Sequence, residues 1–361
     1  MESINELGVK KYIKAFSRHR YKESKRSVKY MMIILAVMPI LAFFISFTIG
    51  RYGISLSEIL NIFFSKVFGL EATWTTTAET VIFKVRTPRI LAAMLVGGAL
   101  SVSGAAYQGL FKNPMVSPDI LGASAGAGFG AAMGILMSFG IIGIQISSFL
   151  FGLGAVALTL IISTIIKKGS NAVLVLVLTG MVVSTLFTSF ISITKYLADP
   201  YSKLPAITFW LMGGLSSISM KDVSIIILPI LFGTVPLILL RWKLNVLSFG
   251  EEEAKALGIR TSVLRIIIIV CSTLLTAASV SICGMIGWVG LIIPHLARML
   301  VGPNYKVLLP TSLFIGSTYL LLVDDVARSS FSLEIPLGIL TSLIGAPFFI
   351  YLLIKGKRGW I

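Results

Sequence analysis

The fold is decided by residues 86–131, which read RTPRILAAMLVGGALSVSGAAYQGLFKNPMVSPDILGASAGAGFGA. The part from Ile90 to Leu110 contains no charged residue. About 20 residues of this apolar and small kind are enough for a helix to cross a hydrocarbon core of roughly 30 Å. A second uncharged run begins after Asp119. We therefore expect two transmembrane helices joined by a tight turn.

The same pattern continues along the chain, which is 56% hydrophobic with a mean hydropathy of +0.94. Runs such as Ile266–Val270 are continuously apolar, whereas a transmembrane barrel would show alternating segments of about ten residues. The sequence thus predicts an all-α polytopic membrane protein with about ten transmembrane helices. The expected spans are 28–50, 90–110, 119–138, 141–166, 172–194, 223–241, 263–282, 285–300, 307–326 and 336–354.

Basic residues set the expected orientation, because cytoplasmic loops carry an excess of Lys and Arg. With the N-terminus inside, 22 of the 31 Lys and Arg residues fall on the cytoplasmic side. Both termini are then cytoplasmic, with residues 1–27 as a basic tail and residues 28–361 as one transmembrane domain. The first apolar run lacks a small-residue cleavage site and predicts a retained helix. The net charge of +16 is then mainly a topology signal and gives no reason to expect nucleic-acid binding.

Acidic residues are informative by their positions. None of the 15 Asp and Glu residues lies in the middle of a long apolar run, although ionisable groups there commonly mark ion pathways. The sequence also lacks the G-x-x-x-x-G-K-[ST] loop of nucleotide-binding domains. If the protein transports a solute, its energy is therefore expected to come from another chain.

Three polar intervals are longer than membrane insertion alone requires. The outer interval 51–89 contains an apolar patch, Ile59–Phe68, that predicts either a surface helix or loop packing. The outer interval 195–222 contains a short apolar core that predicts either a buried helix at a pathway mouth or a surface helix. The inner interval 242–262 predicts a charged cytoplasmic helix, because its acidic run suits a helix N-terminus and Gly258 is a C-cap signal.

A stripe of glycines at a spacing of four residues marks the third expected helix. Positions of this kind let two helices approach closely, so we favour packing over a substrate-lining role. The preceding helix repeats the pattern at Gly97, Ser101 and Ala105. The four stripe residues are Gly122, Gly126, Gly130 and Gly134.

Five segments together resemble the permease subunits of bacterial iron-chelate, haem and cobalamin importers of the FecCD type. Their order and spacing agree with that family over essentially the whole chain after residue 30. The segments are 86–131, quoted above, FWLMGGL at 209–215, LSFGEEEAKALGI at 247–259, GMIGWVGLIIPHLARMLVG at 284–302 and LLVDDVARSSFSLEIPLGILTSLIGAPFFIYLL at 321–353.

The resemblance implies a cobalamin-permease-like helical bundle in the cell membrane. It also implies a homodimer that works with two cytoplasmic ATPase subunits and an extracytoplasmic substrate-binding protein. ATP and Mg²⁺ would bind to the ATPase subunits, and this chain would hold no cofactor and act as a transport subunit, not as an enzyme.

The resemblance further implies that Arg86, Arg89 and Arg328 dock carboxylates of the binding protein at the outer face. Their position supports this, since they lie beside expected helix ends on the side that the positive-inside rule depletes. Paired charges across an interface guide encounter and orientation. The alternative is that the three are snorkelling anchors.

Two inner segments also take roles from the resemblance. The stretch 248–259 would be the element that couples the permease to the ATPase, and the loop after the second helix would carry a gate at Asn113, Pro114 and Met115. This loop departs from the usual family pattern at Ser117. The coupling residues are Phe249, Gly250, Glu251, Glu252, Glu253, Ala254, Leu257 and Gly258.

Pathway and metal-site candidates carry weaker signals. Met181, Phe187, Thr188 and Trp210 could face a pathway, although most such residues at helical spacing serve packing. A lone His295 is poor evidence for a metal site, and we expect none.

Two further side-chain pairs have simple structural interpretations. Cys271 and Cys283 are about 18 Å apart along one helix, too far to form a disulfide. Asp324 and Asp325 predict a helix cap or an ion pair with Arg328.

The sequence therefore predicts the permease of an ATP-driven importer for a metal chelate such as an iron siderophore, haem or cobalamin. An oxyanion such as molybdate on the same scaffold is the alternative. An ion-coupled secondary transporter would need ionisable groups near the membrane midplane. An intramembrane enzyme would need a motif such as H-E-x-x-H or G-x-S-x-G, and the sequence contains neither.

Overall fold

The computed structural model describes residues 30–69, 74–166, 172–330 and 333–356, and within these ranges it contains helices and no strands. The first described helix is Tyr30–Ser46. The others are α2 (Leu56–Phe68), α3 (Thr76–Thr80), the π-helical segment η1 (Val81–Arg86), α4 (Thr87–Leu110), the 3₁₀ turn η2 (Pro118–Leu121), α5 (Ala123–Leu136), α6 (Ile141–Ile166), α7 (Ala172–Leu197), α8 (Lys203–Met212), α9 (Met220–Leu239), α10 (Arg241–Phe249), α11 (Glu251–Ala256), α12 (Thr261–Cys283), α13 (Val289–Val301), α14 (Tyr305–Ser329) and α15 (Leu337–Gly356).

The predicted spans each coincide with a helix of the structure. Among the described residues, six helices are long and apolar enough to cross a membrane: Thr76–Leu110, α6, α7, α9, α12 and α14. Shorter apolar helices at Tyr30–Ser46, α5, α13 and α15 account for the remaining spans. The prediction of an all-α polytopic membrane fold is therefore confirmed.

The interval 51–89 differs from the expected outer loop. Its patch forms α2, which starts at the N-cap Ser55 and ends at Gly69 with a left-handed φ of 66°. Residues from Thr76 onward already belong to the long helix that continues through η1 into α4. Arg86 and Arg89 consequently lie on a helix, because helical hydrogen bonding starts at the N-cap Thr75 and not near Ile90.

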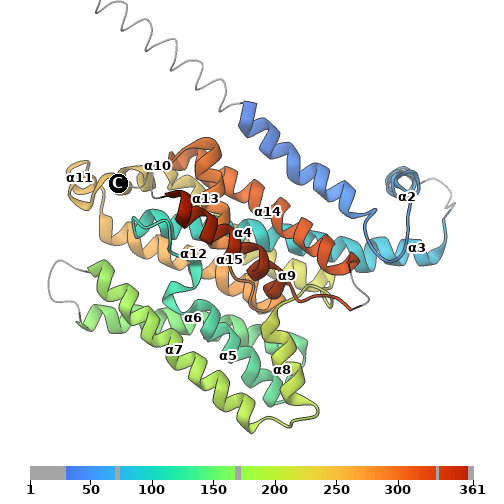
Figure 1. The fold of residues 1–361 in the computed structure, drawn as a ribbon, viewed down its shortest axis with the longest axis horizontal. Helices are drawn as coiled ribbons and strands as arrows, with labels where there is room; N and C mark the ends of the chain where they lie inside the picture. Colours follow the sequence, from blue (N-terminus) through green and yellow to red (C-terminus); the bar gives the residue numbers. More distant parts are fainter. Residues whose placement is uncertain (1–29, 70–73, 167–171, 331–332, 357–361) are drawn as a thin grey trace, which may run out of the picture.

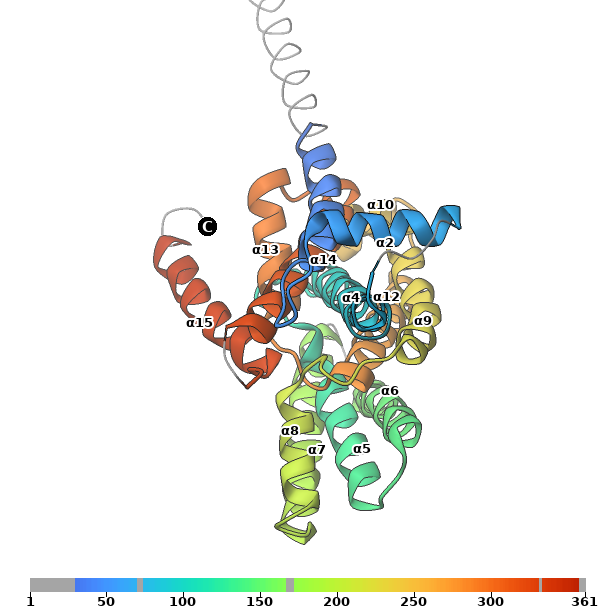
Figure 2. The same cartoon turned by 90° about the vertical axis from the view of Figure 1, so that its right-hand side faces the viewer.

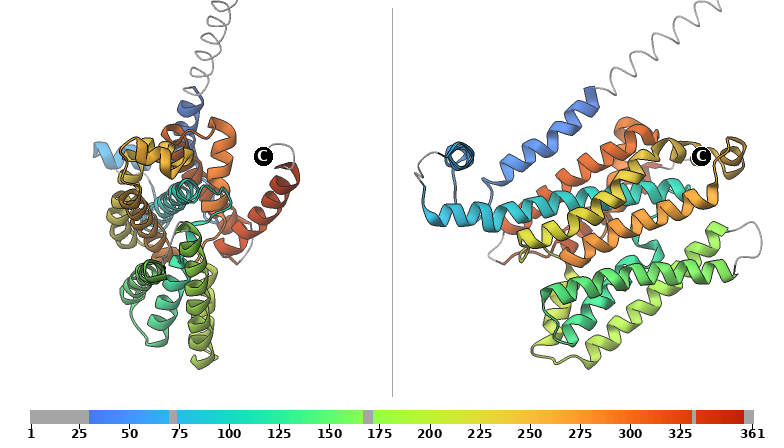
Figure 3. Two further views of the ribbon diagram at one scale, coloured as in Figure 1. Left: turned by 90° about the vertical axis from the view of Figure 1, so that its left-hand side faces the viewer. Right: turned by 180° about the vertical axis from the view of Figure 1, so that it is seen from behind.

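The helices form two groups that run roughly side by side (Figure 1). In one group, α4 packs against α9, α12, α13 and α14, and a view along the bundle shows α4 near its middle (Figure 2). The other group contains α5–α8, and α6 and α5 connect it to α12 (Figure 3). We call the end with α2 and α3 the outer end and the end with α10 and α11 the inner end, following the orientation predicted from the sequence.

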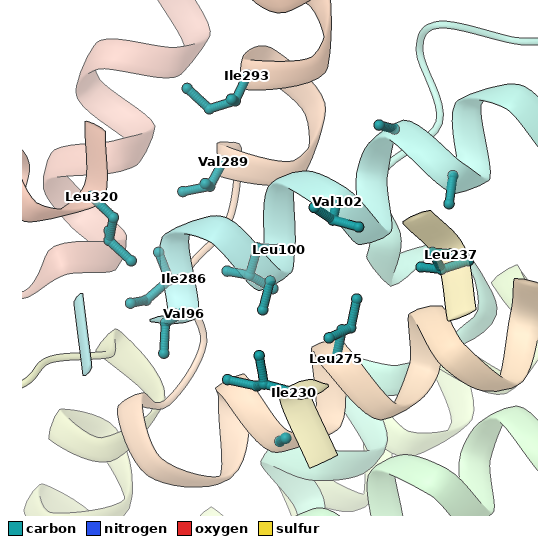
Figure 4. Close-up of a cluster of buried hydrophobic side chains, with 14 of the residues drawn as sticks. Val96, Leu100, Val102, Ile230, Leu237, Leu275, Ile286, Val289, Ile293 and Leu320 are labelled. Carbon is teal, nitrogen blue, oxygen red and sulfur yellow. The ribbon is translucent and has the colours of Figure 1, made fainter. Parts of the chain in front are cut away.

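Apolar side chains and glycines together make the centre of the first group. Val96, Leu100 and Val102 of α4 are at most 4% exposed and meet residues of α9, α12, α13 and α14 in one cluster (Figure 4). A Cβ atom at Gly104 would collide with the backbone of Gly290 on α13, and one at Gly97 with the Gly316 carbonyl on α14. Small residues therefore allow the backbones of these helices to touch.

Candidate functional site

Arg86 lies inside the protein. It is 3% exposed, and its guanidinium donates hydrogen bonds to the carbonyl oxygens of Phe47 and Tyr52. Phe47 follows directly after the helix Tyr30–Ser46, where helix carbonyl groups lack intrahelical partners. Arg86 thus connects the long helix to the end of the N-terminal helix.

Arg89 joins three segments at the outer end. Its Nε and Nη2 donate to Asp324 of α14 at 2.9–3.0 Å, and its Nη1 donates to both oxygens of Glu334 at 2.9–3.0 Å. The side chains of Arg89 and Asp324 are 7% and 0% exposed, whereas that of Glu334 is 35% exposed. Bidentate hydrogen bonds between an arginine and a carboxylate fix the relative orientation of the two side chains and also stabilise their charges.

Arg328 belongs to a second buried group. Its Nη2 donates to the backbone and hydroxyl oxygens of Ser46 at 2.6 Å and to the Asp325 carboxylate one turn earlier on α14. The Ser46 hydroxyl donates to the same carboxylate at 2.6 Å. The outer end of α14 is thereby attached to the end of the N-terminal helix.

These contacts bear on the predicted docking role of the three arginines, which stays a prediction. A docking role needs guanidinium groups that a partner's carboxylate can reach, yet all three are at most 6% exposed and bound to groups of the same chain. Asp324, Asp325 and Glu334 supply internal carboxylates to Arg89 and Arg328, and backbone carbonyl oxygens take this place for Arg86. The ion pair predicted for Asp324 and Asp325 with Arg328 is present for Asp325, while Asp324 pairs with Arg89.

A cavity of about 380 Å³ lies beside Arg89 at the outer end. Trp210 and the turn Gly213–Ile218 line one side of it, and Glu334 and Leu337 line another. Gln145 donates to Asp222 at 2.6 Å in its wall. Segments from both helix groups therefore line the cavity, and its wall combines apolar side chains with a few polar ones.

The short helix α8 is buried on one side and exposed on the other, so its burial lies between the buried and surface helices that the sequence left open. It packs against α5 and α15, with Ile207 buried and Phe209 exposed. Asp199 stabilises the turn that precedes it, and hydrogen bonds from the Ser202 hydroxyl and backbone lower the pKa of Asp199. Trp210 on α8 reaches the outer cavity.

The other pathway candidates lie on α7 and differ in exposure. Phe187 is 8% exposed and packs against the rings of Phe129 and Phe190, so it belongs to the α5–α7 contact. Met181 is 55% exposed, and Thr188 is exposed and donates to the Ser184 carbonyl. These two lie on a surface that the single chain leaves open.

The glycine stripe lies mainly between α5 and α6. A Cβ at Gly126 would meet Ala155 and the Phe151 carbonyl, and one at Gly130 would meet the Ser147 carbonyl. Gly134 is less crowded, with Ile144 at 3.3 Å. Gly122 precedes the helix with a φ of 90°, so its role is to shape the turn into α5.

The expected gate residues lie in the turn after α4. The helix ends in a Schellman motif, because the Asn113 amide donates to the Gln108 carbonyl and the Lys112 amide to the Gly109 carbonyl. The Asn113 side chain accepts from the Met115 amide at 2.9 Å. The turn is thus a defined structure at the inner end, with Pro114 half-buried and Met115 exposed.

The predicted coupling segment, 248–259, contains the last two residues of α10 and the whole of α11, and it protrudes at the inner end (Figure 1). Gly250 separates the two helices, and Gly258 ends α11 with a left-handed φ of 76°. Phe249 and Leu257 are 81% and 63% exposed, so two apolar side chains point away from the bundle. The remaining acidic and small residues of the segment are Glu251, Glu252, Glu253 and Ala254.

One ion pair and a buried side chain attach this segment to the bundle. Glu251 pairs with Arg265 near the start of α12, and Lys255 pairs with Glu252 at 2.9 Å on the surface. Ala254 is fully buried. The segment is therefore anchored on one face and free on the other.

Within the described ranges, no three His, Cys, Asp or Glu side chains form a group that could hold a metal ion. His295 is half-buried on α13, and Cys271 and Cys283 are buried free thiols. The sequence identified Arg89 but missed its partners, Asp324 and Glu334. The adjacent residues Asp324 and Asp325 were the sequence signal that could have pointed to an internal partner.

Comparison with known proteins assigns the chain to one family. Residues 37–355 match the FecCD transport family. The molybdate import system permease protein MolB of Haemophilus influenzae is 45% identical over 90% of this chain and 95% of its own length. A probable iron chelatin transport system permease protein of Helicobacter pylori is 39% identical over 77% of this chain and 83% of its own.

A solved structure also matches nearly the whole chain. It is described as an inward-facing conformation of a putative metal-chelate type ABC transporter and is 42% identical, with a TM-score of 0.81 over 91% of this chain and 99% of its own. PsaBC of Streptococcus pneumoniae shares the fold at 21% identity and a TM-score of 0.54. The protein thus belongs to the FecCD transport family and is a multi-pass ABC transporter permease of the cell membrane, a transport subunit and not an enzyme.

Proposed function

We propose that this permease belongs to an importer that takes up a small oxyanion of the molybdate class. The observation that carries the proposal is the 45% identity to a molybdate import permease over 95% of that protein's length. This match also covers 90% of the present chain. The oxyanion therefore takes precedence over the chelate expected from the sequence.

A metal chelate is the second candidate cargo. It is supported by the 39% identity to probable iron chelatin permeases and to a cobalamin import permease of Halobacterium salinarum. The outer cavity of about 380 Å³ does not discriminate between the two cargoes, since in a dimer the second copy would also line the pathway. A transport measurement is needed to distinguish the oxyanion from the metal chelate.

We further propose that two copies of the chain work with two cytoplasmic ATPase subunits and an extracytoplasmic binding protein. The exposed apolar residues of α7, including Met181, are available for a second copy. Phe249 and Leu257 on the free face of the coupling segment are suited to a cleft in the ATPase, which would hold ATP and Mg²⁺. The turn at Asn113–Met115 then acts as the inner gate of the pathway, with Thr188 and Trp210 along it.

Proteoliposomes containing the permease, its ATPase and its binding protein would test the cargo. Loaded with ATP and Mg²⁺ inside, they would be offered molybdate, a ferric siderophore and cobalamin together, and internal Mo, Fe and Co would be measured by mass spectrometry. We expect ATP-dependent accumulation of Mo. Accumulation of Fe or Co without Mo would establish the chelate, and uptake driven by an ion gradient without ATP would exclude the importer altogether.

A further inference from the structure

A second cavity, of about 280 Å³, lies at the inner end between α4, α10, α13 and α14. Its lining contains two cations, Lys112 and Arg298, and no carboxylate. Within the described part of the chain, neither cation forms an ion pair. The other lining residues are Gln108, Gly109, Asn113, Pro114, Ser248, Pro303 and Tyr305.

The Arg298 guanidinium is held in place by a polar side chain that is itself buried. Gln108 is 2% exposed, and its Oε1 accepts from Arg298 Nη2 at 3.0 Å while its Nε2 donates to the Leu291 carbonyl at 3.2 Å. Arg298 Nη1 is buried and has no acceptor with hydrogen-bond geometry among the described residues, although the Tyr305 hydroxyl lies near enough to interact with the guanidinium. Since buried donors are rarely left unpaired, an acceptor from outside this chain would complete the arrangement.

Lys112 occupies a backbone position that usually favours glycine. Its φ is 50°, at the residue after the C-cap of α4 where a Schellman motif requires a left-handed conformation. Lys in this conformation is unfavourable relative to Gly. A local cost of this kind at the rim of a cavity suggests a use for the ammonium group.

We propose that this inner cavity, built on Lys112 and Arg298, binds a tetrahedral oxyanion, supplied either as a free anion or as the phosphate of an anionic lipid. Guanidinium groups bind phosphate-like oxygens through directed donors, and lysine adds a point charge. Asn113, Ser248 and Tyr305 bring further polar groups to the lining. All of these groups belong to this chain, so the proposed binding of an oxyanion does not depend on which cargo is transported.

The location gives the site a consequence for the proposed importer. Lys112 and Asn113 belong to the gate turn, and Ser248 lies one residue before Phe249 of the coupling segment. An oxyanion in the cavity would therefore connect these two elements with α13. This step rests on the proposed function, whereas binding does not.

Labelling of lysines tests the binding directly. The full chain, purified in detergent, would be treated with an amine-reactive reagent at constant ionic strength in sodium chloride, phosphate, sulfate or molybdate. We expect the tetrahedral anions to lower the labelling rate of Lys112 several-fold relative to chloride. Lys243, an exposed lysine of α10 outside the cavity, should label at the same rate in every buffer.

Two variants identify the partner groups. Arg298→Gln should abolish the protection of Lys112. Bound anions should also raise the melting temperature of the natural protein, and Lys112→Gly should remove this rise while relieving the strained turn. Lys243→Gln is the matched control and should leave both effects intact. Because Lys112→Gly is expected to fold well, an unstable Arg298→Gln protein would not prevent the test.

Nanodiscs separate the two sources of the oxyanion. If Lys112 is protected in phosphatidylglycerol but not in phosphatidylcholine, and free anions have no effect, the ligand is a lipid headgroup. Protection by free anions in phosphatidylcholine assigns the free species. Equal labelling of Lys112 under all conditions would overturn the proposal, and it would leave the cargo measured in proteoliposomes unaffected.

Discussion

Arg89 of α4 and Asp324 of α14 form a bidentate ion pair between residues 235 positions apart, with the Asp324 side chain fully buried. The pair lies where the outer ends of the two helices meet, next to the cavity lined by Arg89 and Glu334. Burial changes what such a pair does, because removing one partner leaves an uncompensated charge in a medium of low polarity. The burial of this pair therefore predicts a structural role for Arg89.

Breaking this pair should destabilise the protein strongly. Asp324→Asn and Arg89→Gln should each lower the free energy of unfolding by about 3–5 kcal/mol, visible as a large drop in melting temperature in detergent. Lys255→Gln removes a partner from the exposed pair with Glu252 and should cost about 1 kcal/mol or less. Similar small losses in all three variants would contradict a structural role for Arg89.

Glu334 is the replaceable partner of Arg89. Its side chain is 35% exposed, so Glu334→Gln should cost about 1 kcal/mol or less while leaving Arg89 paired with Asp324. If a binding protein docks through a carboxylate on Arg89, the variant should associate with it several-fold faster at low salt, and less so at high salt.

Surface plasmon resonance on permease in nanodiscs would measure this association. Glu58→Gln, in the first turn of α2, removes the same charge from the outer end without removing a partner of Arg89. Equal association rates for both variants and the natural protein would show that docking does not use Arg89.

The α5 glycines should tolerate no large side chain. Gly126→Leu and Gly130→Leu should each reduce stability by about 1–3 kcal/mol, because a Cβ at either position already meets the backbone of α6. Gly154→Leu on α6 is the control, since its Cβ would meet nothing within 4 Å. Thermal unfolding followed by size-exclusion chromatography separates these outcomes, and a stable Gly126→Leu protein with altered cargo preference would instead favour a lining role.

The end of α11 should be needed for coupling. Gly258 has a φ of 76°, which proline cannot adopt, so Gly258→Pro should redirect the chain between α11 and α12. We expect ATP hydrolysis by the assembled importer to continue while transport per ATP falls at least about tenfold.

The matched control for this variant is Gly69→Pro, since Gly69 ends α2 at the outer end with a φ of 66°. It should leave the ratio of transport to hydrolysis unchanged. Normal uptake per ATP in Gly258→Pro would show that the shape of α11 is not required for coupling.

The transmembrane helices were predictable because long apolar runs depend only on local sequence. The ends of α9 and α11 likewise carry local signals, namely the Ser219–Asp222 capping box and Gly258. The partners of the arginines were not predictable in this way. Ser46 and Arg328 are 282 positions apart, and Arg89 and Glu334 are 245 apart, so their pairing exists only after the bundle forms.

The candidate site shows the same division. Exposed residues of the coupling segment such as Phe249 could be identified from the family pattern of residues 247–259. The inner cavity could not, because Lys112 and Arg298 belong to segments that are distant in sequence and each residue alone reads as an ordinary helix-end cation. The strained φ of Lys112 has no sequence signal, since the position would normally be expected to hold glycine.

The π-helical segment Val81–Arg86 acts as a rotational offset in the long helix. One additional residue shifts the phase of the preceding turn by about 100° relative to an uninterrupted α-helix. This phase directs Phe83 toward Phe63 of α2, with ring centroids 5.5 Å apart, and buries Ile82 completely. Deleting a single residue here would preserve the helix but swing its first turn away from α2, so the attachment of α2 to the bundle depends on the count of residues as much as on their identity.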